Sequence, residues 1–251
     1  MRPKALTVSV AIVLMVLPAS AHDLFLKLDS YFLPPNAKAK VQLLNGTFQS
    51  SDGLVRRDRM GDISLIARDA GLSPAKSISW RDLGKTTLME IQTGGTVTYV
   101  VGISTKPREI DLKAADFNDY LKHDGIPDIL AKRTTDGELG KDIRERYSKH
   151  VRAIFQVGSA RTEEYRTSLQ YPVEIIPQTN PYSLKVGQTL PVLCTLDGQP
   201  PCQPIRHRRL GVSEWEIKFT QDQNRSKRHR ALQVDGSRKL VRKNDPHVPE
   251  Q

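Results

Sequence analysis

The chain has 251 residues, of which 38% are apolar and 26% are charged, with 16 Gly and 16 Pro. This composition excludes collagen-like and low-complexity chains, and the length allows one large domain or two small ones. The formal net charge of +10 is concentrated at one end, since residues 201–251 hold twelve Lys and Arg against six Asp and Glu. The first 200 residues are close to neutral, so the charge does not predict a nucleic-acid-binding body.

The N-terminus has the three parts of a secretory signal peptide. A basic start over Met1–Lys4 precedes an apolar stretch over Ala5–Leu17, and residues 19–21 form a small-x-small cleavage site. An uncleaved anchor helix is the weaker alternative, because the apolar stretch falls short of the roughly 20 residues that a membrane span needs. We therefore predict a signal peptide over 1–21 and a periplasmic or secreted mature protein that begins at His22.

A histidine at the mature N-terminus offers two nitrogen ligands to one metal ion. The α-amine and the imidazole of His22 have reference pKa values of about 8 and about 6.5, so both can lose a proton to a metal at neutral pH. Such a pair suits Cu(II), Ni(II), Co(II) or Zn(II) better than Ca or Mg, and Asp23 is the next residue. The alternative is that His22 stands there by chance, because some residue must follow any cleavage site.

The region after the predicted cleavage site shows the pattern of a β-sandwich. Short apolar or alternating segments are separated by turn signals such as Asn45-Gly46 and Thr93-Gly94-Gly95, at the spacing typical of sandwiches. The strands expected here are Leu24–Leu28, Tyr31–Leu33, Lys38–Leu44, Ile63–Ala67, Ser77–Trp80, Thr86–Gln92 and Thr96–Ile103.

Between about 113 and 149 the apolar period changes from that of strands to that of helices. Phe117, Tyr120 and Leu121 are spaced as on one helix face, and the charged stretch Glu138–Ser148 contains one early Gly and no Pro. We predict two or three short helices here. A further strand over Val151–Val157 then completes a sandwich that spans 22–170.

A second β-sandwich is predicted to start over 171–200 and then to break off. It has strands at Val173–Pro177 and Thr189–Leu196 and a tight turn at Asp197-Gly198, but no alternating strand follows. Three explanations suit the basic tail over 201–251: an arm for nucleic acid or anionic lipid, a solvated tail, or a lost reading frame. We favour the lost frame, and we expect no compact fold and no site over 203–251.

Three segments resemble an exported, uncharacterised protein family that is related to the periplasmic NikM-like component of nickel and cobalt uptake systems. They are His22–Leu26, Tyr147–Ala153 and Asn180–Gly187, within a resemblance that covers about 1–199. The resemblance implies a β-sandwich body with a helical insert, an immunoglobulin-like C-terminal sandwich and a bound divalent transition metal. It carries a ligand role only to His22 and Asp23, and members of the family usually continue with a His-rich loop that is missing here.

Two other histidines are weaker ligand candidates. His123 ends the first predicted helix, where a histidine more often stabilises the helix terminus, and His150 begins a predicted strand. Cys194 and Cys202 lie on either side of the Asp197-Gly198 turn, and in an exported protein they are candidates for a disulfide.

Several other site types are missing from the sequence. There is no His-x-x-x-His, Cys-x-x-Cys or Gly-x-Ser-x-Gly motif, no phosphate-binding glycine loop and no dinucleotide fingerprint. An oxidative copper enzyme with a terminal histidine would need further histidine ligands, for which the sequence shows no paired partner. We therefore predict a protein that is not an enzyme.

The predicted function is binding of a divalent transition metal (Ni, Co or Cu) in the periplasm, in support of uptake by a membrane transporter. The alternative is a non-metal binding or structural β-sandwich module of the cell envelope. Nucleic acid is not an expected partner.

Overall fold

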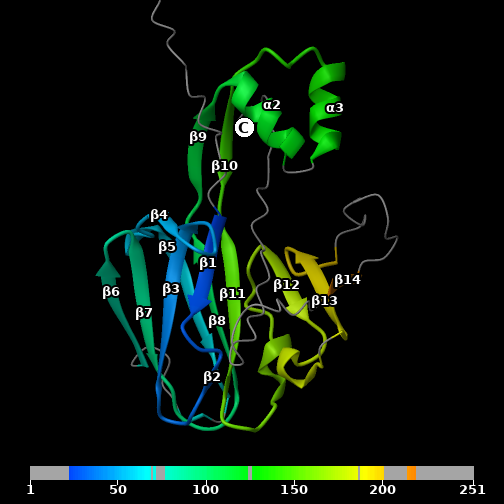
Figure 1. Cartoon of the computed structure of the whole chain (residues 1–251). Coiled ribbons are helices and arrows are strands. Elements are labelled where there is room, and N and C mark those ends of the chain that lie inside the picture. Colours follow the sequence, from blue (N-terminus) through cyan, green and yellow to red (C-terminus); the bar gives the residue numbers. More distant parts are fainter. Residues whose placement is uncertain are drawn as a thin grey trace, which may run out of the picture.

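The computed structural model describes residues 23–68, 70–71, 77–123, 126–185, 187–200 and 214–218. Its body is a sandwich of two sheets, from which an arm of two strands and two helices projects, and a smaller sheet lies beside it (Figure 1). The prediction of a mainly β, antiparallel sandwich with a short helical insert is confirmed. Among the described residues, no helix is both long and apolar enough to span a bilayer.

Each sheet of the sandwich has four main strands. The order in the first sheet is β1–β3–β7–β6, with β4 added at the end of β3, and the order in the second is β2–β11–β8–β5. All neighbours are antiparallel except β2 and β11. The bounds are β1 (Asp23–Leu28), β2 (Phe32–Leu33), β3 (Lys38–Gly46), β4 (Ser51–Gly53), β5 (Met60–Ile66), β6 (Ile78–Leu83), β7 (Thr86–Gln92), β8 (Thr98–Thr105) and β11 (His150–Val157).

The core lies between the two sheets and follows the alternation of the strands. In β1 every second residue is buried, so Leu24, Leu26 and Leu28 face the core while Asp23 faces outward. Strand β11 is buried on both faces, because its second face is covered by the segment that follows it. Val151 and Ala153 belong to the core between the sheets.

The first and last elements of the arm are two strands that form one ribbon. Strands β9 (Arg108–Leu112) and β10 (Ile143–Tyr147) pair with each other. Helices α2 (Ala114–His123) and α3 (Pro127–Thr135) come between them in the chain and lie at the far end of the ribbon (Figure 1). The prediction of helix over the charged stretch 138–148 is therefore wrong for β10. Exposed arginines alternate there with the buried Glu145, and the strand gains the cross-strand pair Arg144–Asp111.

A strap over residues 162–171 leads from the sandwich to the second unit, which we define as residues 172–200 with β14. The strap contains the short helix η2 (Glu163–Arg166) and packs over Gly102 of β8, where a Cβ atom would lie 2.3 Å from Leu169 Cδ1. Only glycine leaves room for this close approach. The second unit contains β12 (Val173–Pro177), the short helix η3 (Pro181–Ser183) and β13 (Thr189–Leu196).

The second unit has three strands rather than the two expected. Strand β14 (Glu214–Lys218) pairs antiparallel with β13, with Ile217 opposite Leu190. The expectation that nothing beyond residue 203 joins the fold is therefore wrong for these five residues. The reason is that a sheet edge offers backbone partners to any chain that can extend beside it. The rest of the tail, the predicted signal peptide and His22 lie outside the described residues.

Candidate functional site

Strand β1 begins at Asp23, one residue after the predicted mature terminus. Its register pairs Asp23 with Gly46 and Leu24 with Asn45. Lys149, next to the first residue of β11, donates from Nζ to Asn45 Oδ1 at 3.2 Å. The starts of β1 and β11 therefore lie at the same end of the sandwich, which is also the end from which the arm projects (Figure 1).

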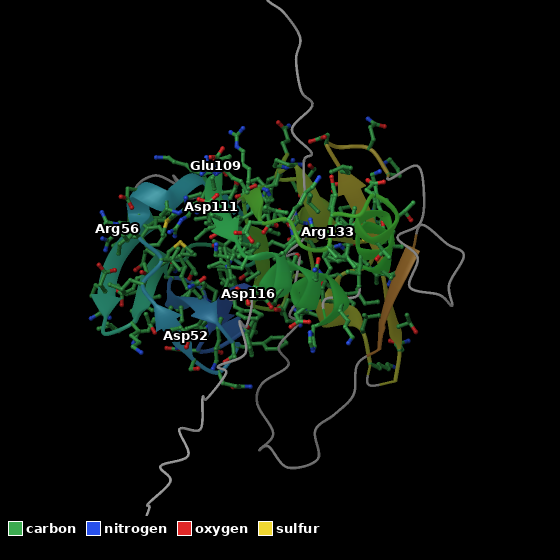
Figure 2. The ribbon with its side chains drawn as sticks, turned by 90° about the horizontal axis from the view of Figure 1, so that it is seen from above. Asp52, Arg56, Glu109, Asp111, Asp116 and Arg133 are labelled. Carbon is green, nitrogen blue, oxygen red and sulfur yellow. The ribbon has the colours of Figure 1, made fainter. Side chains whose placement is uncertain are left out.

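The carboxylate of Asp52 fills the space beside Gly46. A Cβ atom on Gly46 would lie 2.7 Å from Asp52 Oδ2, and the φ of +154° at Gly46 is one that other residues rarely adopt. Residues opposite each other in an antiparallel pair point to the same side of the sheet, so Asp23 and Asp52 share one side at Gly46. Figure 2, which looks down on this end, labels Asp52 beside the sandwich strands.

No motif in the sequence singles out Asp52. The Asn45-Gly46 pair suggests a turn, but Gly46 still belongs to β3, and the chain reverses only after it, so that β4 returns beside β3. The sequence does contain a weak signal for this arrangement. Gly46 lies just after a predicted strand, and the polar run Ser51-Asp52-Gly53 follows a few residues later.

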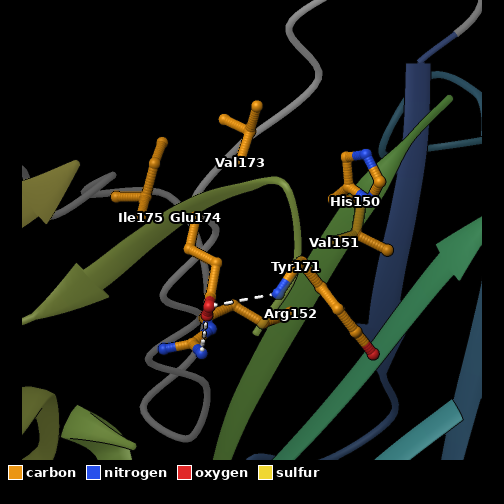
Figure 3. A pocket seen from close by; sticks show the side chains of 7 residues that line it. All are labelled: His150, Val151, Arg152, Tyr171, Val173, Glu174 and Ile175. Atoms are coloured by element: carbon orange, nitrogen blue, oxygen red, sulfur yellow. Dashed lines mark hydrogen bonds and ion pairs between the residues drawn. The ribbon is translucent and has the colours of Figure 1, made fainter. Parts of the chain in front are cut away.

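His150 lines a pocket at the joint between the sandwich and the second unit (Figure 3). The pocket is formed by the start of β11, the end of the strap and the start of β12. Its lining residues are His150, Val151, Arg152, Tyr171, Val173, Glu174 and Ile175.

Both nitrogens of the His150 ring are held by serine hydroxyls. Ser104 Oγ lies 2.9 Å from Nδ1 and Ser148 Oγ lies 2.9 Å from Nε2, while the ring centroid lies 5.9 Å from that of Tyr171. Burial lowers the pKa of His150, and the nearby Glu174 carboxylate offsets part of that shift. Burial thereby favours the neutral imidazole, but a metal ion could bind it only by displacing one of the serines.

His123 ends α2 on the arm, and its Nδ1 lies 2.8 Å from the carbonyl oxygen of Asp119. This carbonyl group lies one turn before the end of α2, where histidine side chains commonly bond to carbonyl groups near a helix C-terminus. The geometry is that of a helix-terminus residue.

The structure does not bring the described ligand candidates together. Asp23 points outward from the first sheet, whereas His150 points outward from the second, and stacked sheets lie about 10 Å apart. Within the described ranges, no three His, Cys, Asp or Glu side chains are grouped so that they could hold a metal ion. Cys194 is half-buried in β13, and its predicted partner Cys202 lies outside the described residues, as does His22.

Comparison with known families gives a match over most of the chain. Residues 19–203 match the family described as Domain of unknown function (DUF4198), and this match includes the sandwich, the arm, the strap and β12 and β13. It ends at 203, where the sequence becomes basic. No curated protein and no solved structure matches the chain significantly. As the match covers well over half of its length, the chain belongs to the DUF4198 family, whose function is unknown.

Proposed function

We propose that this protein is exported and binds a divalent transition metal, Ni(II), Co(II) or Cu(II), in support of uptake by a membrane transporter. The related proposal is that its family shares ancestry with the NikM-like periplasmic components of nickel and cobalt uptake. The metal would be held at the mature N-terminus rather than inside the sandwich.

The position of β1 is the observation that carries this proposal. His22 is bonded directly to Asp23, which is the first residue of a strand that is paired along its whole length with β3. A terminal amine and imidazole would therefore be joined to a rigid element, and a rigid mount reduces the entropy lost when they bind a metal together.

The surroundings of Asp23 suit the chemistry of such a site. Asp52 brings a carboxylate to the side of the sheet on which Asp23 lies, where Gly46 leaves the room for it. Two nitrogens and one or two carboxylate oxygens form a donor set that suits divalent first-row transition metals of intermediate softness, such as Ni(II), Co(II) and Cu(II). We propose His22 as the chelating residue, with Asp23 and Asp52 as the carboxylates near it.

Metal titration of the mature protein tests this proposal. Ni(II) is titrated by calorimetry into protein that begins at His22 and into protein that keeps Ala21, because an added residue converts the terminal amine into an amide. We expect the added residue to weaken binding by about a hundredfold and Asp52→Asn to weaken it by about tenfold.

Asp29→Asn is the matched control. Asp29 is an exposed carboxylate one residue beyond the other end of β1, where it accepts a hydrogen bond from Gln42 that an asparagine oxygen can keep. This variant should bind Ni(II) like the unmodified protein. Equal affinity in the two forms with different N-termini, or no binding in either, would refute the metal proposal.

The alternative is a binding or structural module of the cell envelope that uses no metal. It is favoured by the finding that the described residues contain no metal-binding group of three side chains. The calorimetric comparison separates the two functions, since this module would show no dependence on the N-terminal residue.

A further inference from the structure

The joint between the sandwich and the second unit contains a buried ion pair. Arg152 on β11 donates from Nη2 to Glu174 Oε2 on β12 at 2.8 Å, and the two side chains are only 7% and 2% exposed. Removing two charges from water is unfavourable unless their other hydrogen-bonding positions are also filled. The groups around Glu174 therefore decide whether this pair holds the joint together.

Four donors surround the Glu174 carboxylate, two at each oxygen. Oε1 accepts hydrogen bonds from Ser168 Oγ at 2.6 Å and from the N–H of Tyr171 at 3.3 Å. Oε2 accepts from the N–H of Leu169 at 2.9 Å as well as from Arg152. Figure 3 shows Glu174 extending from β12 toward Arg152, on the side away from its neighbours in the strand. The carboxylate is fully satisfied without water.

The strap is folded in a way that presents these donors. Gln170 has a φ of +59°, in the left-handed region, and its N–H donates to Ser168 Oγ at 3.0 Å. Arg152 also donates from Nη2 to the carbonyl oxygen of Thr167 at 2.9 Å. The strap and the arginine are thus held to each other as well as to Glu174, which favours a preformed receptor over a chance contact.

We propose that Arg152, Ser168 and the N–H groups of Leu169 and Tyr171 form a carboxylate receptor whose occupant is the side chain of Glu174. Occupation of this receptor holds the strap and the start of β12 against the sandwich. An emptied receptor leaves a buried guanidinium and two N–H groups without their acceptor, so the joint opens. A small free carboxylate has the same two oxygen acceptors, so it can occupy the emptied receptor and hold the joint closed again.

Chemical rescue of Glu174→Ala by acetate tests the proposal on the full chain. Trypsin cleaves after arginine, and Arg166 lies in the strap with its side chain 54% exposed, so cleavage there reports how often the strap opens. We expect Glu174→Ala to be cleaved after Arg166 about a hundredfold faster than the wild type. Sodium acetate should slow this cleavage about tenfold relative to sodium chloride at the same ionic strength.

Glu174→Gln separates charge from size, because it keeps the volume of the side chain and loses the carboxylate. It should also be cleaved faster than the wild type. If Glu174→Ala does not fold in chloride, the refolding yield in acetate against chloride gives the same comparison, and a higher yield in acetate is expected.

Asp111→Ala is the matched control. Asp111 is likewise paired with an arginine, Arg144, here through two hydrogen bonds, but both side chains are exposed, at 72% and 62%. Its removal should not change cleavage after Arg166, and acetate should have no effect. The proposal is overturned if Glu174→Gln resists trypsin like the wild type, or if acetate and chloride act alike on Glu174→Ala.

Discussion

The side-chain amide of Asn180 donates from Nδ2 to the hydroxyl oxygen of Thr98, 3.0 Å away and 82 positions earlier in the chain. It also donates to the carbonyl oxygen of Thr162 in the strap, and its Oδ1 accepts the N–H of Tyr182. The Tyr182 hydroxyl in turn donates to the carbonyl oxygen of Ile154. The second unit is therefore tied to both β8 and β11 of the sandwich.

Asn180→Ala should destabilise the whole chain. The substitution leaves the buried N–H of Tyr182 without an acceptor, so we expect the free energy of unfolding to fall by about 1–3 kcal/mol. Urea unfolding measures the change. Gln49→Ala, at an exposed position in a loop, should change it by less than about 0.5 kcal/mol. A similar loss in both variants would contradict the role assigned to Asn180.

Gly102→Ala should move the strap. The new Cβ atom would lie 2.3 Å from Leu169 Cδ1 and 3.0 Å from the Tyr171 hydroxyl, so one of them must shift. We expect a loss of about 1–3 kcal/mol in the free energy of unfolding, measured by urea titration. Gly140→Ala is the control, since nothing lies within 4 Å of its Cβ position. An unchanged stability of Gly102→Ala would show that the strap is not confined here.

Acid should weaken the fold through His150. Burial lowers its pKa, so below about pH 6.5 the unfolded chain takes up a proton before the folded chain does. The contribution of this group is complete above pH about 6.5 and is lost as the pH falls through the folded pKa. Urea unfolding at about pH 7.5 and about pH 5.5 should show a larger loss for the wild type than for His150→Gln.

His123→Gln serves as the comparison for the pH experiment, because His123 is exposed at the end of α2. This variant should lose as much stability on acidification as the wild type. If His150→Gln loses just as much, the buried imidazole is not the group that responds.

Arg133 should hold the arm together without supporting the sandwich. It is buried in the arm, where it donates to Asn118 Oδ1 and to the carbonyl oxygens of Glu138 and Lys141, and its guanidinium lies 5.1 Å from the ring centre of Phe117. Figure 2 labels it on the arm. Arg133→Met should therefore increase hydrogen exchange over 114–135 about tenfold or more.

Exchange in the sandwich strands of Arg133→Met should remain as in the wild type. Lys132→Met is a matched control, since it removes a partly exposed ion pair between α3 and Asp136, the residue that follows the helix. Faster exchange throughout the chain would show that the arm and the sandwich unfold together.

The predicted signal peptide can be tested by measuring the intact mass of the mature protein. The full gene expressed in a bacterial host should yield periplasmic protein whose intact mass corresponds to a chain that begins at His22. Ala21→Leu places a large residue at the cleavage position and should leave the uncleaved precursor. A mature chain that begins elsewhere would remove the chelate argument from the proposed function.

Several features of the fold could be predicted from the sequence because their signals are local. The alternation in Leu24–Leu28 and Thr86–Gln92 depends only on which side chains are apolar, and both segments lie in strands of the sandwich. Strand β12 was predicted at its observed bounds, Val173–Pro177, and so was β13, Thr189–Leu196. In each case the apolar residues and the flanking turn signals were enough.

Strand β10 was not predicted because its charged residues lie on both faces, so apolar and polar residues do not alternate along it. In β10 the arginines face solvent on one side while Glu145 is buried on the other, and the pairing with β9 decides between helix and strand. Strand β14 was missed for a related reason, since the open edge of β13 supplies its partner. A pattern within one segment cannot report a partner that lies elsewhere in the chain.

The sequence by itself determined that the body is a β-sandwich, and it marked His22 as the chemically distinctive residue of the predicted mature chain. Only the tertiary structure decided which side chains meet. It placed Asp52 beside Gly46 and separated Asp23 from His150 across the sandwich. It also enclosed Glu174 in the strap. The physical reason is that periodicity fixes which face of an element is apolar, whereas the contacts of a polar side chain depend on register and on close approaches between distant segments.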